Sequence, residues 1–257
     1  MSTKPAETPL RNIDLGHSHS DGLQAWHLYN EQGGEVFDWT QNGNDLEIVD
    51  AEWVSDPDVE SGLQFDANGE YAAFDNTDQV INSEVGTIII KFKSLSSFGD
   101  SSARTLLGKW GGVSTNGDFT IIKSGGNKFF FWFVDNTTFH YIRFALTSFP
   151  TWQTGSFIAA QWDRGNAIYD SKNMAINING NYITPDASAN ATSWNQFTVA
   201  SDLYIGNDAS QTDFYCNGII SDSRIFNKVV SEDVLVDIWE NPYDSLIVYP
   251  EDEDDLW

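Results

Sequence analysis

The sequence predicts an all-β fold in which two antiparallel sheets pack face to face as a sandwich, with one short helix near the C-terminus. Short apolar segments of strand length alternate with turns, and many of the 20 glycines in the 257 residues stand at the segment ends. Hydrophobic residues make up 40% of the chain and aromatic residues 14%, which is enough to fill the space between two sheets. No fixed-period repeat is present, so a solenoid or a propeller is not expected.

The predicted strands are short runs of β-branched and aromatic residues, each bounded by turn residues. In chain order they include 22–31, 63–66, 87–93, 106–110, 129–133, 157–163, 203–205 and 218–227. The rest of the chain is expected to be arranged around the segment 218–227. Its apolar residues Ile220 and Ile225 flank a polar break at Ser221-Asp222-Ser223.

Two local signals define the C-terminal half. Asn179-Gly180 is a strong signal for a hairpin turn between two strands. Ser231 suits the N-cap of a helix, and the acidic residues Glu232 and Asp233 suit the positive end of the helix dipole. A short helix is therefore expected at about 231–240.

The ordered set of segments resembles the laminin-G-like domains of the concanavalin-A-like jelly rolls. Leu203-Tyr204-Ile205-Gly206 followed by 218–227 is similar to the segment that closes those domains, and Leu63-Gln64-Phe65-Asp66 is similar to an earlier element. Phe157 departs from the family pattern, which usually has His-Val there. The matches run in family order from about Gly22 to Tyr243, and they imply one jelly-roll domain.

The resemblance divides the chain into three parts: a polar N-terminal arm at 1–20, a laminin-G-like domain at 21–249 and an acidic C-terminal tail at 250–257. A helix that ends in Asn241-Pro242-Tyr243 is similar to laminin-G-like proteins encoded in bacteriophage and marine viral genomes. The acidic run of the tail is expected to be disordered in isolation. Its apolar end, Leu256-Trp257, is alternatively a docking peptide.

Composition excludes several classes of protein. The net charge of −25 repels phosphate backbones, so nucleic-acid binding is not expected. The first nine residues lack the apolar core of a signal peptide, and no apolar run is long enough to insert into a membrane. Cys216 is the only cysteine, so no intrachain disulfide forms, and a buried thiol in a strand is expected there.

Catalysis is not expected. Glycoside hydrolases need two suitably spaced carboxyl groups. On a strand at 47–52, Asp50 and Glu52 would share one face while Glu47 would point to the other. No Gly-x-Ser-x-Gly motif is present, and three of the four histidines fall within residues 17–27. The pair His17 and His19 is either a metal-ligating pair without a third ligand or part of a solvated linker.

An oxygen-rich region is a candidate calcium site. Asp66, Asn68, Glu70 and Asp75 crowd one loop–strand–loop region, and Ca²⁺ takes 6–8 oxygen ligands. The resemblance supports this reading, because related laminin-G-like and pentraxin-like domains carry calcium at a sheet rim. A solvated acidic loop is the alternative.

Three tryptophans are candidates for carbohydrate binding. Trp110 stands beside two glycines, Trp132 lies in the aromatic run 129–133, and Trp152 is the third. An indole face offers a sugar an apolar platform. The alternative is that these tryptophans cover the core of the sandwich. One face of 129–133 must line that core, and an exposed aromatic row on the other face would mark an interface.

These features favour a non-catalytic surface protein of a virus particle, either a capsid decoration protein or a fibre-associated protein, that adsorbs to host glycans. Its partners would be other virion proteins and further copies of the chain, most simply in a trimer, and it would be made in the host cytoplasm. The alternative is a calcium-assisted lectin-like module of a bacterial surface protein, extracellular or at the cell surface. A glycoside hydrolase or polysaccharide lyase is the third reading.

Overall fold

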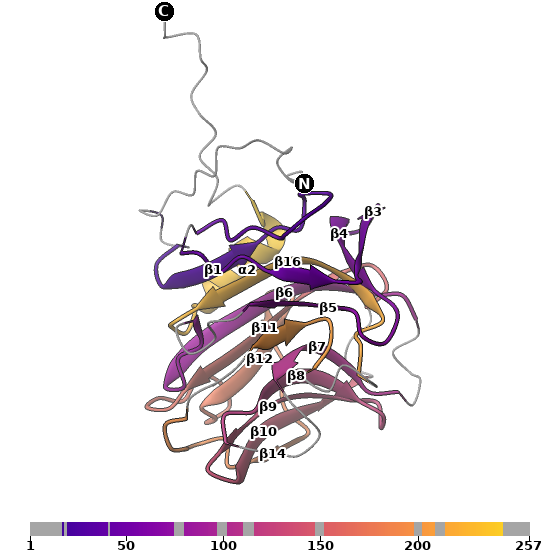
Figure 1. The fold of residues 1–257 in the computed structure, drawn as a ribbon. Coiled ribbons are helices and arrows are strands. Elements are labelled where there is room, and N and C mark those ends of the chain that lie inside the picture. Colours follow the sequence, from indigo (N-terminus) through magenta and orange to yellow (C-terminus); the bar gives the residue numbers. More distant parts are fainter. Residues whose placement is uncertain are drawn as a thin grey trace, which may run out of the picture.

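The computed structural model describes residues 17, 20–40, 42–74, 80–96, 102–109, 116–146, 152–197, 202–208 and 214–243. Two antiparallel sheets make up this part of the chain, as the sequence predicts (Figure 1). Among the described residues, no helix is both long and apolar enough to cross a membrane. The acidic tail, with Leu256 and Trp257, and nearly all of the N-terminal arm lie outside the described residues.

The first sheet is here called the β16 sheet. In spatial order its strands are β13 (Asn181–Tyr182), β12 (Met174–Ile178), β11 (Ser156–Asp163), β6 (Val85–Ser94), β16 (Gly218–Phe226), β4 (Glu60–Phe65) and β3 (Glu52–Asp56), and β1 (Leu23–His27) pairs with β16. The β12–β13 hairpin turns at Asn179-Gly180, where both residues have positive φ, as predicted.

The second sheet is here called the β9 sheet. Its strands, in spatial order, are β14 (Ala187–Ala189), β10 (Thr138–Ala145), β9 (Lys128–Asp135), β8 (Phe119–Ser124), β7 (Arg104–Lys109), β15 (Leu203–Ile205), β5 (Tyr71–Phe74) and β2 (Glu47–Val49). All of the pairings in both sheets are antiparallel.

Strand β16 pairs with three other strands of its sheet. Along one edge it pairs with β6 over its whole length; along the other it pairs with β4 at its start and with β1 at its end. The predicted polar break does not interrupt this strand. Ser221, Asp222 and Ser223 are buried, and the strand continues through them with a bulge between Ile220 and Asp222. Asp222 pairs with Arg224, and Ser223 contacts His27 and Tyr29.

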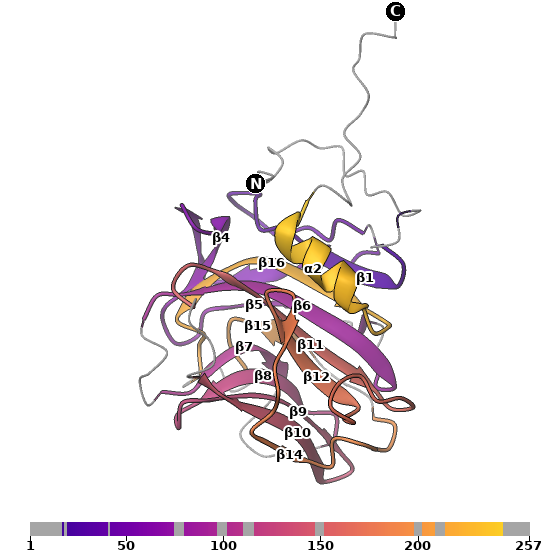
Figure 2. The same cartoon turned by 180° about the vertical axis from the view of Figure 1, so that it is seen from behind.

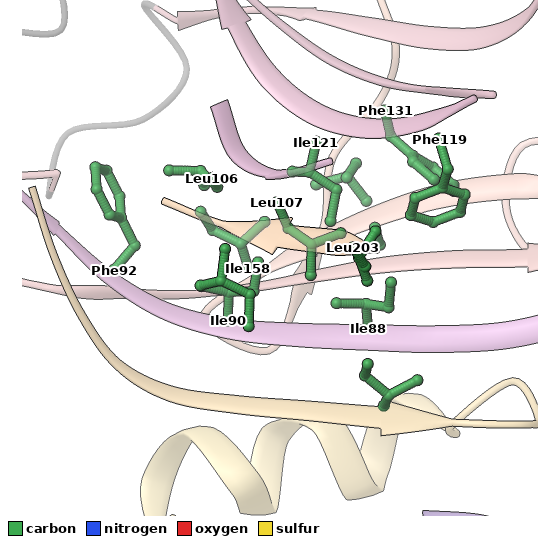
Figure 3. Close-up of a cluster of buried hydrophobic side chains, with 14 of the residues drawn as sticks. Ile88, Ile90, Phe92, Leu106, Leu107, Phe119, Ile121, Phe131, Ile158 and Leu203 are labelled. Carbon is green, nitrogen blue, oxygen red and sulfur yellow. The ribbon is translucent and has the colours of Figure 1, made fainter. Parts of the chain in front are cut away.

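The main core lies between the two sheets. Ile88 and Ile90 of β6 and Ile158 of β11 face side chains of the β9 sheet such as Leu107, Ile121 and Phe131 (Figure 3). These side chains are buried because strands alternate their side chains between two faces, and one face of each sheet is apolar.

A second apolar layer lies on the outer face of the β16 sheet. The helix α2 (Glu232–Glu240) crosses this face (Figure 2), and its Leu235 and Ile238 pack against Phe226, Phe157 and Ile89. Ser231 has the extended backbone of an N-cap, as predicted, but its side chain makes no capping hydrogen bond.

Two expectations about local structure are wrong. Residues 47–52 do not form one strand, because Asp50 adopts a left-handed conformation (φ 57°) and the chain passes there from β2 in one sheet to β3 in the other. Cys216 does not lie in a strand. It is buried in the irregular segment before β16, where its backbone N–H donates to the Gly206 carbonyl at 2.7 Å.

Candidate functional site

The strand β9 carries aromatic residues on both of its faces. Phe129, Phe131 and Phe133 point inward and are fully buried in the core. Phe130 and Trp132 therefore point outward, away from the core. The expectation that one face of 129–133 lines the core is confirmed.

The outward face of the β9 sheet is hollowed. The hollow has a volume of about 500 Å³ and draws its walls from β8, β9, β10 and two flanking loops. Its lining residues are Ala103, Ile122, Ser124, Phe130, Trp132, Phe139, Tyr141, Arg143 and Phe214. The size and the largely aromatic lining are those of a small-molecule site, which is typically about 300–1,000 Å³.

Strand pairing places the aromatic residues of the hollow in register. Trp132 stands opposite Tyr141, and Phe130 stands opposite Arg143. The ring centroids of Phe130 and Tyr141 lie 5.8 Å apart, and those of Trp132 and Phe139 lie 5.2 Å apart. Aromatic pairs at such distances attract one another, so they stiffen the floor of the hollow.

The most exposed aromatic residue of this floor is Phe139. Its exposed fraction is 42%, whereas that of Trp132 is 7%. Trp132 packs in a cluster with Ile122 and Val134, against which Phe214 and Ala103 also pack. Phe214 is held beside β7, since its carbonyl accepts a hydrogen bond from the Thr105 N–H at 2.7 Å. An incoming ligand therefore meets Phe139 first and Trp132 behind it.

One end of the hollow is charged. The Arg143 Nε donates to the Asp186 Oδ1 at 2.9 Å, and the Lys128 ammonium donates to the other oxygen of the same carboxylate. Burial of the Asp186 carboxyl opposes its ionisation, but the hydrogen bonds from Lys128 and Arg143 prevail and lower its pKa. Asp186 thus stays ionised and holds Arg143 by a single nitrogen.

The structure separates the three predicted carbohydrate-binding tryptophans. Trp132 lies in the hollow, and Trp110 lies outside the described residues. Trp152 is only 6% exposed, and its ring packs on Phe92 and Phe129 in the core between the sheets. That position matches the alternative reading of Trp152 as a residue that covers the core.

Three of the four predicted calcium ligands are described. The Glu70 carboxylate accepts the backbone N–H groups of Asp66, at 2.5 Å, and Ala67, at 2.9 Å, and thereby closes the 66–70 turn. Asp66 accepts a hydrogen bond from the Gln64 side chain, Asn68 is exposed, and Asp75 lies outside the described residues. In the part of the chain that the structure describes, no three His, Cys, Asp or Glu side chains are grouped as a metal site would need.

The carboxylates considered for catalysis do not lie on one strand. Glu47 and Glu52 belong to different sheets, so they do not line one cleft as neighbours on a strand would. Among the residues that the structure describes, no carboxylate lines the hollow. A buried pair, His140 and Asp135, is fully engaged in holding the fold: the imidazole contacts the Asp135 Oδ1 at 2.7 Å and the Asn190 carbonyl at 2.8 Å.

Sequence reasoning missed Phe139, Tyr141 and Arg143. The signal for them was present, because the turn residues Asn136 and Thr137 follow β9 directly and imply an antiparallel partner strand. Alternation along that partner places residues 139, 141 and 143 on one face, beside Phe130 and Trp132.

Comparisons with solved structures show a similar fold in binding domains of botulinum neurotoxin. The receptor-binding domain of botulinum neurotoxin D is 13% identical with a TM-score of 0.63, covering 88% of this chain and 54% of that one. The serotype D ligand-binding domain, solved in complex with N-acetylneuraminic acid, is 14% identical with a TM-score of 0.62 and coverages of 86% and 51%. The chain thus spans about half of each neurotoxin domain.

The sialidase of Trypanosoma rangeli is similar over a smaller share of its length. In complex with the inhibitor DANA it is 14% identical with a TM-score of 0.55, and the alignment covers 84% of this chain and 32% of the enzyme. In a second structure of the enzyme the identity is again 14%, the TM-score is 0.57, and the coverages are 85% and 32%. No functionally curated protein matches the chain by sequence.

A family model matches residues 66–235, which is most of the described sandwich. The match includes the strands of the hollow, β8, β9 and β10, and extends into helix α2. The jelly-roll fold predicted from the ordered strand motifs is therefore confirmed. By its fold and by this match, the chain belongs to the laminin-G group of the concanavalin A-like lectin/glucanases superfamily.

Proposed function

We propose that this protein is a non-catalytic carbohydrate-binding module and that its sugar site is the aromatic hollow on the β9 sheet. The observation that carries the proposal is the exposed ring of Phe139 beside Trp132 and Tyr141, above a floor built from paired strands. Clustered aromatic surface at a concave site is uncommon on a protein without a ligand.

The makeup of the hollow supports binding rather than catalysis. Its described polar lining residues are Ser124, Tyr141 and Arg143, and the carboxylate pair with which most glycoside hydrolases work is not among them. The similar ligand-binding domain of botulinum neurotoxin D, in complex with N-acetylneuraminic acid, supports sugar binding on this fold by analogy.

A glycan array tests this function. The purified protein, Phe139→Ala and the control Phe37→Ala are compared on the same array. Phe37 is exposed to a similar degree (37%) but lies outside the hollow, so it controls for general loss of an aromatic ring. We expect the wild type and Phe37→Ala to bind the same glycans and Phe139→Ala to lose at least about tenfold in affinity. Absence of binding, or equal binding by all three proteins, would refute the site.

Calcium assistance is a separate part of the proposal. Glu70 and Asp66 lie in one turn, and the array is therefore run with calcium and again with a chelator. Binding that disappears with the chelator would support the predicted ligands Asp66, Asn68, Glu70 and Asp75. Binding that persists would show that sugar binding in the hollow does not require calcium.

The surface of a virus particle remains our proposed location for this module. Sedimentation equilibrium of the purified chain tests it, because subunit contacts on a particle predict a homo-oligomer, most simply a trimer. A monomer that binds glycans would instead favour a lectin-like module of a bacterial surface protein.

A further inference from the structure

Among the described residues that line the hollow, only three are polar, and two of them, Arg143 and Ser124, lie toward one end. Arg143 stands opposite Phe130 on the neighbouring strand and two residues from Tyr141 on the same face. Ser124 lies one strand further, on β8. The opposite end, around Phe139, is apolar, and Tyr141 lies between the two ends, opposite Trp132.

This distribution disfavours a sugar that carries only hydroxyl groups. A buried hydroxyl without a hydrogen-bond partner loses its interaction with water and gains nothing in return, which weakens binding. Three polar side chains can serve only some of the hydroxyls of a hexose unit. A substituent that is apolar on one side and accepts a hydrogen bond on the other fits the lining better.

Arg143 supplies the donor for such a substituent. Its Nε is occupied by Asp186, whereas its two Nη groups have no hydrogen-bond partner in the described structure, and its side chain is one-third exposed. Asp186 thus fixes the guanidinium plane and leaves its outer N–H groups for a ligand oxygen. Hydrogen bonds from a charged donor are about twice as strong as neutral ones.

We propose, on the basis of the proposed sugar site, that the hollow selects sugars that carry an acetamido group. The carbonyl oxygen of the acetamido group accepts from the Arg143 Nη groups, and its methyl group packs on the rings of Phe130 and Tyr141. The sugar chain then extends over Trp132 to Phe139. The strand distance from residue 143 to residue 139 is about 14 Å, so more than one sugar unit fits along it.

Matched glycans test the selection directly. Tri-N-acetylchitotriose and cellotriose share β-1,4-linked glucose backbones and differ in having an acetamido or a hydroxyl group at C2. Both are neutral, so the charge of the protein affects them equally. We expect the acetylated trisaccharide to bind at least tenfold more tightly in titration calorimetry, and saturation-transfer NMR to show the strongest transfer at its acetyl methyl protons.

Two variants locate the selectivity. Arg143→Gln is expected to lose about tenfold in affinity for the acetylated sugar and little for cellotriose. Arg164→Gln is the control, because Arg164 is also an exposed arginine paired with a carboxylate, that of Glu84, but lies outside the hollow. Thermal unfolding of each variant checks that the fold is unchanged.

The outcomes separate this inference from the proposed function. Equal affinity for both trisaccharides overturns the acetamido selection while the sugar site stands. An acetyl preference that survives unchanged in Arg143→Gln overturns the assignment of that selection to Arg143. A glycan array on which matched hydroxyl and acetamido sugars of every backbone fail to bind overturns both. Binding of an aromatic peptide in the hollow, without any sugar, also overturns both.

Discussion

The guanidinium of Arg224 lies side by side with the carboxylate of Asp222, with Nε–Oδ1 at 3.0 Å and Nη2–Oδ2 at 2.8 Å, and both side chains are fully buried. The same guanidinium lies 4.4 Å from the ring centroid of Trp26 and donates to the Pro242 carbonyl at 2.6 Å. This pair therefore joins β16, β1 and the segment after α2. Asp222 and Arg224, two polar residues of β16, therefore hold these segments together.

Removing one member of this pair is expected to destabilise the protein strongly. Arg224→Met leaves the Asp222 carboxylate buried and unpaired, and the free energy of unfolding should fall by about 3–5 kcal/mol in urea denaturation. The exposed pair Arg164–Glu84 is the control, since Arg164→Met should cost at most about 1 kcal/mol. The double variant Asp222→Leu/Arg224→Met should recover much of the loss; failure to recover would show that the pair has a further role.

Gly206 is required by its backbone and by its surroundings. Its φ is +83°, and a Cβ there would lie 2.4 Å from the Phe65 ring. Gly206→Ala should therefore cost about 3 kcal/mol or more, the sum of a left-handed backbone penalty and overpacking. Gly43 has a similar φ of +80° with nothing within 4 Å, so Gly43→Ala should cost only about 1–2 kcal/mol. Equal unfolding midpoints for the two variants would show that the Phe65 ring or the backbone moves and relieves the clash at residue 206.

The sequence predicts those parts of the fold that depend on local patterns. Period-two alternation predicts that one face of 129–133 lines the core, and burial identifies that face as Phe129, Phe131 and Phe133. Asn179-Gly180 and Ser231 mark the hairpin and the helix start. These features require no knowledge of distant partners, because a strand face, a turn type and an N-cap are set by a few neighbouring residues.

The site depends on contacts between residues far apart in the chain, which the pattern does not contain. Phe214 and Ala103 come from loops distant in sequence, and together they cover Trp132. The carboxylate that orients Arg143 comes from Asp186, 43 residues away. The crossing at Asp50 was missed for another reason: Asp enters the left-handed region more often than most residues, but still uncommonly, so the residue type alone does not predict it.

Cys216 should be inert in the folded protein. It is fully buried, and burial raises the pKa of its thiol, so the reactive thiolate is suppressed. At pH 8 we expect a thiol reagent to modify Cys216 only at the rate of unfolding. Ser188→Cys, at an exposed position of β14, provides a second thiol that should react within the mixing time. Rapid modification of Cys216 without unfolding would mean that the segment before β16 opens locally.

His27 makes the stability of the protein depend on pH. Its Nε2 lies 2.7 Å from the Asn44 carbonyl, which can only accept, so Nε2 carries the proton. Its Nδ1 lies 3.1 Å from the Ser223 Oγ and accepts from that hydroxyl, while the Tyr29 hydroxyl donates to Ser223 at 2.9 Å. Burial lowers the pKa of His27 below its ordinary value of 6.5. The folded protein therefore holds this imidazole neutral.

Because the unfolded chain binds a proton here more readily than the folded one, stability should fall as the pH drops below about 6.5 and level off at the folded-state pKa. The slope from this single group is at most ~1.4 kcal/mol per pH unit. Urea denaturation at pH 7.5 and 5.5 measures the loss. His27→Gln keeps a donor and an acceptor without a titrating group, so its stability should change less over this range. An equal loss in the variant would assign the pH dependence to other groups, and the imidazole shifts of His27 in NMR would then show protonation in the folded state.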